Sequence, residues 1–346
     1  MRAAITRDRG VMDVVDVPEP GEPGPSEVLV RPEAVGICGS DFHYYLGDIG
    51  TVDASSLYPR ILGHETAATI EAVGPDCAPE LAPGTRVALW PVKGCGRCYA
   101  CRIGRENVCA SLSLIGVHRD GALQDRLLVP APQVFPVGDQ DPITAALIEP
   151  VSIAMHAVER GRIAHGERVV VFGAGPIGQA LALAATDRGA RVLLVDRLES
   201  RLAPGAAICA ELLCLEAGED VVLRAREWAG DDGPEVVIEA TGVPELVKPA
   251  AQLVAHAGRV VVVGLSAHDA PLRVGDLPFK ELDLLGVSCC GSMEFAAAVE
   301  LVGRRRDVAA PLVTHQFPLE QTPEAMEYAL HNPDEVMKAV VRLDES

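Results

Sequence analysis

Short apolar runs broken by glycine and proline make up about the first 150 residues of the chain. Typical runs are strand-length and rich in β-branched residues, as at 27–31, 69–73 and 86–90. Runs of this kind between turn-forming residues are typical of antiparallel strands. No helix of ordinary length is expected before about Ile143. The pattern therefore predicts a mostly antiparallel, β-rich domain.

From about residue 150 onward, strand-like runs alternate with helical patterns. The strand-like runs lie at 168–172, 191–195, 235–239 and 259–263, and the helical patterns at 177–188 and 244–256. This alternation is typical of a parallel, doubly wound sheet. After about Gly286 the chain has a helical stretch, 292–303, and ends in a strand, 337–342. The pattern leaves open whether that strand joins the second sheet or returns to the first domain.

A glycine-rich turn joins the first strand of the second region to its first helix. It reads Gly173-Ala-Gly175-Pro176-Ile177-Gly178. In such a turn the first glycine permits a tight bend, the second lets the backbone approach a pyrophosphate, and the third lets helix and strand pack closely. The alternative is a glycine-rich turn in an α/β domain that binds nothing. A strand, three glycines, a helix and an acidic residue in register favour a dinucleotide site.

That acidic residue is Asp196, which closes the second strand 23 residues after Gly173. A carboxylate there can accept hydrogen bonds from both ribose hydroxyls of NAD. It would repel the 2′-phosphate of NADP, even though Arg197 follows it. We therefore expect NAD as the cofactor. The candidate cofactor-binding residues are Gly173, Gly175, Pro176, Ile177, Gly178, Asp196 and Arg201.

Four of the ten cysteines lie close together, at Cys95, Cys98, Cys101 and Cys109. Four thiolates at this spacing can surround one tetrahedral Zn²⁺, and a closed four-thiolate site leaves no position for a substrate. The spacing differs from the bacterial iron–sulfur pattern, and neighbouring thiols without a metal would be prone to oxidation. We therefore expect a structural zinc lobe at about 93–110.

Candidate ligands for a second metal are separated in the sequence: Cys38, His64 with Glu65, and Glu149. One sulfur, one nitrogen and one or two carboxylates suit a catalytic zinc that keeps a coordination position open. Each residue also has an ordinary interpretation, as a buried small cysteine, a hydrogen-bonded histidine or a glutamate in a turn. Spacing alone does not show that these residues meet.

Taken together and in this order, the motifs resemble those of the medium-chain zinc-dependent alcohol dehydrogenases. They are Cys38-Gly-Ser40-Asp-Phe-His43, Gly63-His64-Glu65, the four-cysteine lobe, Glu149-Pro150 and the glycine-rich turn. The resemblance covers essentially the whole chain. It is nearest to the polyol branch, which includes sorbitol dehydrogenase and L-idonate 5-dehydrogenase, because of the segments 38–45 and 148–150.

The resemblance implies an α/β protein with two domains. Residues 1–147 would form a GroES-like, β-rich catalytic domain, and residues 148–284 a doubly wound parallel Rossmann domain that binds NAD. Residues 285–346 would return to the catalytic domain. Relatives form homodimers or homotetramers, in part by edge pairing of Rossmann sheets, and the strand around 284–288 is the candidate edge.

The resemblance also implies the chemistry of the site, with two zinc ions per chain. Cys38 and His64 would bind the catalytic zinc directly. Either Glu65 or Glu149 would be the third ligand, with the other acting through the metal-bound water. Ser40 and His43 resemble the family's proton relay, so Ser40, His43 and Glu65 are the candidate catalytic residues. The implied reaction transfers a hydride to NAD from a secondary alcohol of a polyol, a sugar acid or a cyclitol.

Three other functions remain as alternatives. The first is a dehydrogenase of a different secondary alcohol or of an amino alcohol. The second is a zinc-free reductase of the same superfamily, against which Cys38, His64 and Glu149 argue. The third is a non-catalytic NAD-binding protein on the same fold. A complete set of metal ligands together with Ser40 and His43 argues against it.

The sequence departs from the polyol branch in one segment. Where those enzymes carry an arginine–aromatic pair that contacts the substrate, residues 286–291 contain Cys289 and Cys290. Losing that arginine weakens the case for sorbitol itself. At 116–121, His118 and Arg119 are candidate substrate contacts, although the following Asp-Gly pair is typical of a hairpin turn.

Charge and composition exclude several classes of partner. With 30 basic and 49 acidic residues the formal net charge is −19, which disfavours a nucleic-acid surface. No apolar run approaches the ~18 residues of a membrane span, and the first residues lack the apolar core of a secretion signal. We expect a cytoplasmic protein whose clustered cysteines bind metal and whose partner is a small molecule.

Overall fold

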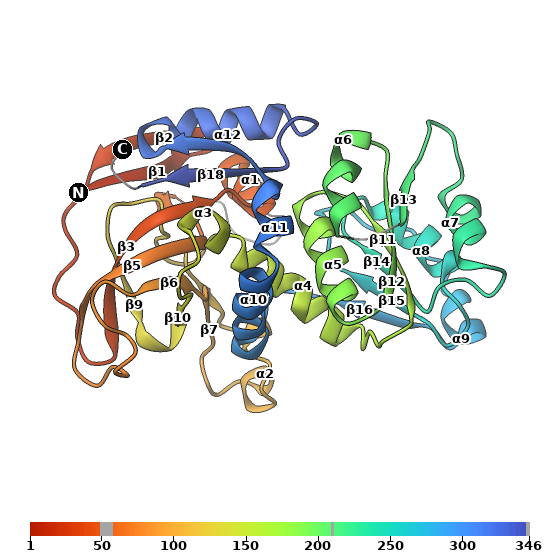
Figure 1. Ribbon diagram of the computed structural model, residues 1–346, viewed down its shortest axis with the longest axis horizontal. Helices are drawn as coiled ribbons and strands as arrows, with labels where there is room; N and C mark the ends of the chain where they lie inside the picture. The colour runs from red at the N-terminus through yellow and green to blue at the C-terminus, as the bar shows by residue number, and fades with distance from the viewer. Residues whose placement is uncertain (49–57, 209–210, 344–346) are drawn as a thin grey trace. The chain divides into compact units, whose positions relative to one another are not determined.

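The computed structural model describes residues 1–48, 58–208 and 211–343 (Figure 1). The chain divides into two compact units, one made of Met1–Glu149 with Cys289–Ser346 and the other of Pro150–Ser288. The expected boundaries were 147/148 and 284/285. The first observed boundary falls inside helix α4 (Ile148–Arg160). None of the helices in the described ranges combines the length and the apolar character that a membrane span needs.

The first unit is built mainly from antiparallel sheet. Its largest sheet has the order β10-β6-β5-β3-β18-β17, with β9 also paired to β3. Its strands are β3 (Glu27–Gly36), β5 (Glu65–Val73), β6 (Arg86–Leu89), β9 (Leu127–Pro130), β10 (Val134–Pro136), β17 (Val313–Pro318) and β18 (Lys338–Arg342). Because β18 pairs antiparallel with β3, the C-terminal strand joins the first sheet, a point that the apolar pattern left open.

Smaller sheets and helices complete this unit. The smaller sheets have the orders β2-β1-β4 and β7-β8, with bounds β1 (Arg2–Asp8), β2 (Val11–Asp16), β4 (Arg60–Ile61), β7 (Val92–Lys93) and β8 (Ser113–Leu114). Its helices are α1 (Gly39–Leu46), α2 (Tyr99–Arg102), α3 (Pro142–Ala145), α10 (Ser292–Arg304), α11 (Arg306–Ala309) and α12 (Thr322–His331). Short 3₁₀ turns lie at Glu106–Val108, Ala131–Gln133, Ala310–Leu312 and Leu319–Gln321.

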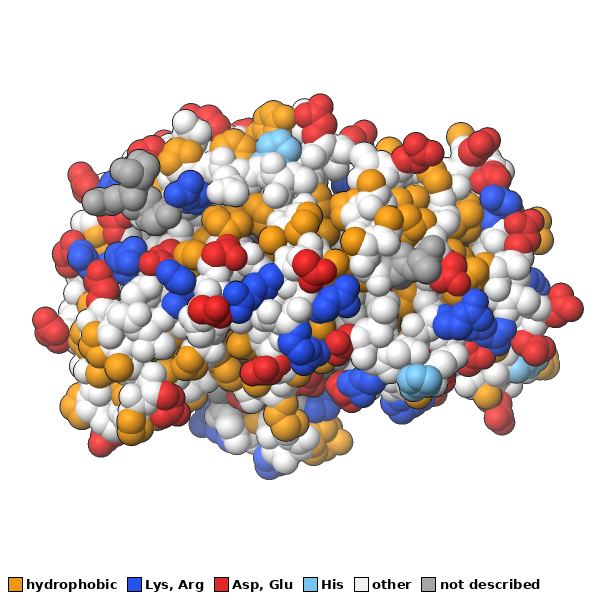
Figure 2. Space-filling view, in the orientation of Figure 1, with side chains coloured by type: hydrophobic (Ala, Val, Ile, Leu, Met, Phe, Trp, Pro, Cys, Tyr) orange, Lys and Arg blue, Asp and Glu red, His pale blue; other side chains and the backbone are white. Residues whose placement is uncertain are grey.

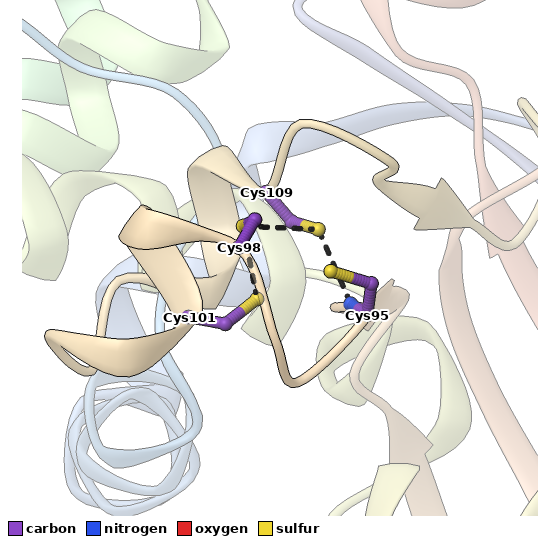
Figure 3. A group of neighbouring side chains, drawn as sticks. All are labelled: Cys95, Cys98, Cys101 and Cys109. Atoms are coloured by element: carbon purple, nitrogen blue, oxygen red, sulfur yellow. Dashed lines mark hydrogen bonds between the residues drawn. The ribbon is translucent and has the colours of Figure 1, made fainter.

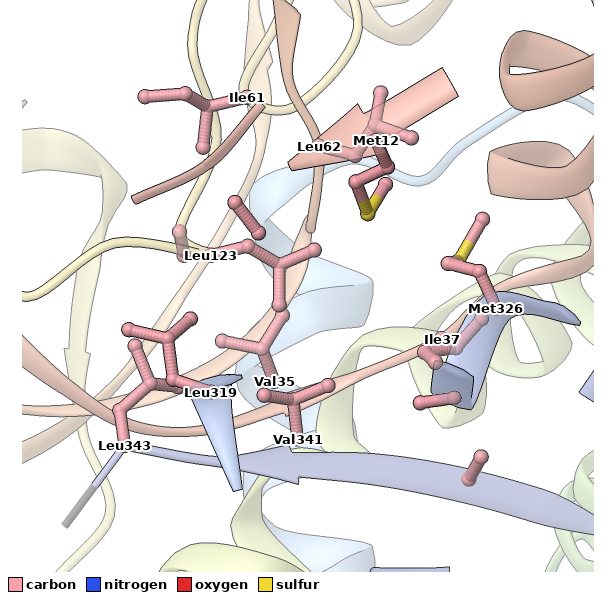
Figure 4. Packing of buried hydrophobic residues seen from close by; sticks show 14 of the residues in the cluster. Met12, Val35, Ile37, Ile61, Leu62, Leu123, Leu319, Met326, Val341 and Leu343 are labelled. Carbon is pink, nitrogen blue, oxygen red and sulfur yellow. The ribbon is translucent and has the colours of Figure 1, made fainter. Parts of the chain in front are cut away.

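One apolar core packs the first strands of this unit against its last helix, α12, and its last strand, β18. Met12, Val35, Met326 and Val341 are all buried in it, and Figure 4 shows their side chains together with those of neighbouring strands. Alternate residues of β18 contribute to this core, because side chains of a strand point to opposite faces in turn. Lys338 lies on the opposite face of β18 and is buried too. That face is the one that carries the site described below.

The second unit is a parallel sheet with the order β13-β12-β11-β14-β15-β16 in the described residues. Its strands are β11 (Arg168–Phe172), β12 (Arg191–Asp196), β13 (Glu211–Cys214), β14 (Val236–Glu239), β15 (Arg259–Val262) and β16 (Asp283–Gly286). Its other helices are α5 (Pro176–Asp187), α6 (Glu199–Leu202), α7 (Val221–Ala229), α8 (Val247–Leu253) and α9 (Asp276–Lys280), with 3₁₀ turns at Ala203–Ala207 and Pro244–Leu246. The strand order reverses between β11 and β14, which is the doubly wound arrangement that the alternating pattern predicts.

Two local features differ from the apolar pattern's predictions. Helix α1 is not predicted, since its sequence mixes polar and aromatic residues; it begins after Cys38 and ends at Gly47, whose φ is +63°. The hairpin expected around Asp120 is wrong. The turn lies at 116–119 instead, where the N–H of Gly116 donates to the carbonyl oxygen of Arg119 at 2.9 Å. The N–H of Gly121 donates to the carbonyl oxygen of Ile61 at 2.7 Å.

Charged side chains are mixed on the surface of the molecule. On the face shown in Figure 2, basic side chains alternate with acidic ones. Many of them form ion pairs, such as Arg126 with Glu19 and Glu71. Nucleic-acid binding requires basic side chains that displace the counterions of the phosphates. A surface with a net charge of −19 disfavours such binding.

Candidate metal centres and cofactor site

Cys38 stands at the junction of a central strand and a helix. It follows the end of β3 and is the N-cap residue of α1, with extended backbone angles. Its backbone N–H donates to Oδ2 of Asp41 at 2.9 Å. Because Asp41 is buried and part of this cap, its carboxylate is held in one place beside the Cys38 thiol.

His64 and Glu65 enter the same region from β5. The preceding Gly63 has a φ of +95°, and a Cβ there would lie 2.7 Å from a methyl carbon of Val35, so only glycine fits this bend. His64 is 8% exposed and Glu65 is fully buried. The bend therefore delivers both side chains to the interior next to Cys38.

The ligand atoms of Cys38, His64 and Glu65 lie within 4.8 Å of one another. Residues far apart in the sequence thus form one group with a sulfur, a nitrogen and an oxygen donor. His64 Nδ1 lies 3.5 Å from Asp41 Oδ1, and neither atom has a hydrogen-bond partner among the described residues. A sulfur, a nitrogen and an oxygen donor, with the Asp41 carboxylate beside His64, fit a zinc ion that keeps one coordination position open.

Charges in this group interact strongly, because His64 and Glu65 are buried. Burial by itself would lower the pKa of His64, but the charges of Asp41 and Cys38 outweigh it and raise that pKa well above its usual value. The acidic groups around His64 thus favour a positive charge at this place. A divalent cation would supply that charge.

Glu149 approaches the same group from the first turn of α4 and is 7% exposed. Burial raises the pKa of Glu149 to about 7, the charge of His64 opposes this, and Glu65 adds to it. Glu149 is not part of the group of three whose ligand atoms lie within 4.8 Å. The structure thus places Glu65 nearer than Glu149 to the other two donors.

Lys338 is a member of this site that the sequence analysis missed. It begins β18, is 3% exposed, and its Nζ lies 2.7 Å and 2.8 Å from the two carboxylate oxygens of Glu65. Burial alone would lower the pKa of Lys338, but the charges of Glu65 and Cys38 outweigh it and raise that pKa. A lysine directly before the apolar run 339–341 was the available signal, since buried lysines are rare unless paired.

Ser40 and His43 both lie on α1, three residues apart, and so on one face of the helix. His43 Nδ1 lies 2.8 Å from Oδ1 of Asp48, and the His43 side chain is 41% exposed. Ser40 is half-buried. The helix therefore carries a half-buried hydroxyl two residues after Cys38 and an imidazole in reach of solvent.

The four cysteines of the lobe form a second candidate metal centre (Figure 3). Their sulfur atoms lie within 4.8 Å of one another, with Cys98 Sγ 3.5 Å from Cys101 Sγ and 3.8 Å from Cys109 Sγ. Hydrogen bonds from the backbone N–H groups of Cys101 and Ala110 lower the pKa of Cys98 to about 6. Four sulfur atoms converging on one point fit a tetrahedral zinc.

The glycine-rich turn has the geometry that a dinucleotide requires. Gly173 has a φ of +97°, and a Cβ on Gly178 would lie 1.9 Å from the carbonyl oxygen of Gly173. Gly175 is the N-cap of α5 and Pro176 its first residue. The turn therefore presents open backbone at a helix N-terminus, where a pyrophosphate binds.

Asp196 stands at the carboxyl end of β12 beside this turn. Its Oδ2 accepts from the N–H of Ala174 at 2.8 Å, and its Oδ1 from that of Arg197 at 2.7 Å. A guanidinium nitrogen of Arg201 lies 3.4 Å from where a Cβ on Gly175 would be. Gln179, which the sequence analysis missed, holds the turn through the carbonyl oxygens of Ala174 and Arg201.

Two family models match the chain. A model described as the alcohol dehydrogenase GroES-like domain matches residues 24–139, and one described as zinc-binding dehydrogenase matches residues 176–304. The L-galactonate-5-dehydrogenase of Escherichia coli is 35% identical over 319 residues, which are 92% of each chain. The sorbitol dehydrogenase of Bacillus subtilis is 34% identical over 346 residues, 99% of this chain and 97% of that one.

The chain belongs to the zinc-dependent alcohol dehydrogenase family. Solved structures agree with this membership. An Escherichia coli oxidoreductase of unknown specificity aligns with a TM-score of 0.92 at 28% identity, over 99% of both chains. L-idonate 5-dehydrogenase from Escherichia coli aligns with a TM-score of 0.87 at 27% identity, over 99% of this chain and 98% of that one. These findings confirm the predicted family, the predicted α/β fold class and the prediction of an oxidoreductase.

In this dehydrogenase, the segment that departs from the polyol pattern is held by packing. Cys290 is 1% exposed, and its carbonyl oxygen accepts from Nε1 of Trp90 at 3.2 Å. Cys289 has a φ of +49° and its charge contributes to the raised pKa of Tyr44, whose main cause is burial. Cys289 therefore lies near Tyr44 of α1.

Arg119 and His118 are held by neighbouring residues of the same unit. Arg119 donates to Oε1 of Gln133, whose amide donates in turn to the carbonyl oxygens of Trp90 and Val92. His118 Nδ1 accepts from the N–H of Leu114 at 3.1 Å. Both side chains thus brace the segment beside Trp90.

Proposed function

We propose that this dehydrogenase oxidises a secondary alcohol of a polyol, a sugar acid or a cyclitol and transfers the hydride to NAD. The observation that carries the proposal is the buried group of Cys38, His64 and Glu65, with donor atoms within 4.8 Å of one another. Its mixed donors suit a catalytic zinc, whereas a zinc-free reductase would have no use for them. A bound zinc would act as a Lewis acid that lowers the pKa of the substrate hydroxyl.

The surrounding residues have distinct roles in this proposal. Cys38 and His64 would hold the metal, and Asp41, whose Oδ1 lies 3.5 Å from Nδ1 of His64, would help to orient the ring. Glu65 would be the third donor, because it is the carboxylate within the group of three, and Glu149 would act through the metal-bound water. The alternative assignment exchanges Glu65 and Glu149.

A proton leaves the site through α1 in this proposal. The Ser40 hydroxyl accepts the proton of the substrate alcohol and passes it to His43 on the same helix face. His43 releases it to solvent, since its side chain is partly exposed. Asp48 accepts from Nδ1 of His43 and fixes the ring.

The substrate class rests on the relatives. One is an L-galactonate-5-dehydrogenase, others are sorbitol dehydrogenases, and one solved relative is an L-idonate 5-dehydrogenase. All of these names denote oxidation of one hydroxyl on a polyhydroxylated carbon chain. A second candidate class, other secondary alcohols, is favoured by a solved relative named 2R,3R-butanediol dehydrogenase.

The choice of NAD rests on Asp196. Its carboxylate stands where the adenosine ribose is expected and would repel a 2′-phosphate. The solved relatives include one with NADH and one with NADP, so the family accommodates both cofactors. The glycine turn and Arg201 would bind the pyrophosphate, which both cofactors share. We also propose that the four-cysteine lobe binds a second, structural zinc, and that the protein is cytoplasmic.

A substrate panel with NAD⁺ and NADP⁺ tests this proposal. The panel contains linear polyols, sugar acids, cyclitols and simple secondary alcohols, and absorbance of the reduced cofactor is followed. We expect turnover in the polyhydroxylated classes, with kcat/KM at least about tenfold higher for NAD⁺, which corresponds to about 1.4 kcal/mol. A preference for NADP⁺ would overturn the assignment of Asp196.

Metal analysis tests the proposed zinc sites independently of turnover. We expect two zinc ions per chain, and one in Cys38→Ala, which should lose turnover but still bind NAD. One or no zinc in the unaltered protein would contradict the catalytic centre. Absence of turnover with the whole panel would support the non-catalytic alternative.

A further inference from the structure

Lys338 uses all of its hydrogen-bonding capacity inside the metal group. Its Nζ donates to Glu65 Oε1 at 2.7 Å, to Glu65 Oε2 at 2.8 Å and to the carbonyl oxygen of Ile37 at 3.0 Å. An ammonium has three donors, so none remains for another partner. Both side chains are nearly excluded from solvent, with 3% and 1% exposed.

The carboxylate of Glu65 is also fixed from its other side. A Cβ on Gly36 would lie 2.0 Å from Glu65 Oε2, so the carboxylate lies directly over the glycine backbone. Gly36 is paired with Glu65 between β3 and β5, and with Val340 between β3 and β18. Three adjacent strands thus set the position of one carboxylate relative to Lys338.

With a metal bound, Glu65 would share its negative charge between the Lys338 ammonium and the metal. Both of its oxygens accept from the ammonium, although one of them also belongs to the group of metal donors. Opposite charges within hydrogen-bonding distance interact strongly in a buried site, so the ammonium weakens the hold of the carboxylate on a metal. A carboxylate free of Lys338 would bind the same metal more tightly.

We propose that Lys338 is a positioning residue that restrains Glu65 from binding the catalytic metal at full strength and so keeps one coordination position available to the substrate. This inference rests on the metal site proposed above. It assigns Lys338 a role beyond neutralising a buried carboxylate. If Lys338 only stabilised the site, its loss would make zinc release faster. If Lys338 restrains Glu65, its loss makes zinc release slower.

Lys338→Met and Lys338→Arg test the proposal in the zinc-loaded enzyme. Release of zinc to a chromophoric chelator is measured together with kcat and with the visible spectrum of the cobalt-substituted enzyme. For Lys338→Met we expect zinc release from the catalytic site to slow and kcat to fall, each by about 10- to 100-fold. The cobalt bands should change, because they report the ligands and their number. Lys338→Arg keeps the charge and should stay close to the unaltered enzyme in all three measurements.

Lys280→Met is the matched control. The Lys280 ammonium also has three protein partners, the carbonyl oxygens of Ala251, Gln252 and Val254, but it lies in the second unit. Its loss should leave zinc release, the cobalt spectrum and kcat unchanged. If Lys338→Met does not fold, Lys338→Gln replaces it, with the same expected direction for zinc release.

A double variant shows whether Lys338 acts through Glu65. In a Glu65→Gln background, Lys338→Met should change zinc release less than about twofold, since the carboxylate that it restrains is gone. Faster zinc release in Lys338→Met, an unchanged cobalt spectrum, or an equal effect in both backgrounds would overturn the proposal. If the unaltered enzyme holds only the zinc of the cysteine lobe, the proposed function fails instead, and the two failures are thereby distinguished.

Discussion

At the level of single residues, the residue type at several positions follows from one close neighbour. Gly63 turns the chain where any Cβ would meet Val35, and Gly178 lies against the backbone of Gly173. Lys338 is tolerated in the interior because Glu65 is there to pair with it. In each case the residue type follows from a contact with a partner that is distant or on another element.

Gly178→Ala tests this argument at the cofactor turn. The new Cβ would lie 1.9 Å from the carbonyl oxygen of Gly173, so the turn and α5 must move apart. We expect a loss of stability of about 1–3 kcal/mol and a higher KM for NAD⁺. Thermal unfolding and steady-state kinetics measure the two effects.

Gly21→Ala provides the comparison, because a Cβ at that position has no heavy atom within 4 Å. Its unfolding temperature and its KM for NAD⁺ should match those of the unaltered protein. Equal values for Gly178→Ala would show that the turn does not need a glycine there.

At the level of elements, the cysteine lobe cannot hold itself together by secondary structure. It contains a four-residue helix, α2, a three-residue 3₁₀ turn and the two-residue strand β7. Helices of this length are not stable by themselves, because nucleation costs more than so few hydrogen bonds return. A metal bound by four thiolates supplies the missing constraint.

Cys98→Ser tests the role of the lobe. We expect the zinc content to fall from two to one per chain and trypsin to cleave the lobe at least about tenfold faster, equivalent to about 1.4 kcal/mol in its opening free energy. Arg97 and Arg102 are exposed cleavage sites within it. Cleavage products are identified by mass spectrometry.

Cys77→Ser is the control for that experiment. Cys77 lies outside the lobe and its thiol donates to the carbonyl oxygen of Glu27, a bond that serine can also make. It should retain two zinc ions and the proteolytic pattern of the unaltered protein. Retention of both zinc ions in Cys98→Ser would rule out a four-thiolate site.

At the level of the whole molecule, β16 forms one edge of the second unit's sheet in the residues that the structure describes. Strand β16 is the last in its sheet, and most of its residues are exposed, including Leu284 at 41%. Unpaired backbone groups on an exposed edge favour pairing with another chain. We expect a homodimer or homotetramer in which two copies of β16 pair.

Leu284→Lys should weaken that assembly, because two lysines would face each other across the paired edges. Light scattering coupled to size-exclusion chromatography should show a smaller species for this variant. Leu223→Lys, at a 63% exposed leucine of α7, should leave the mass unchanged. If both variants keep the mass of the unaltered protein, β16 is not the contact.

The sequence by itself determined the features that depend on neighbours along the chain. The apolar run of β11, the glycine turn and the spacing of Cys95 to Cys109 each fall within a short window. Local propensity and metal-ligand spacing are sufficient to interpret such windows. Resemblance extended this to the family, which the comparisons confirm, and to an expected order of two domains.

Only the tertiary structure decided what depends on strands meeting across the fold. Pairing of β18 with β3 placed Lys338 against Glu65, and pairing of β3 with β5 placed Glu65 over Gly36. It also ranked Glu65 ahead of Glu149 by distance to the other donors. The physical reason is that register between strands is set by the burial of whole faces, so contacts 273 residues apart carry no signal in either local sequence.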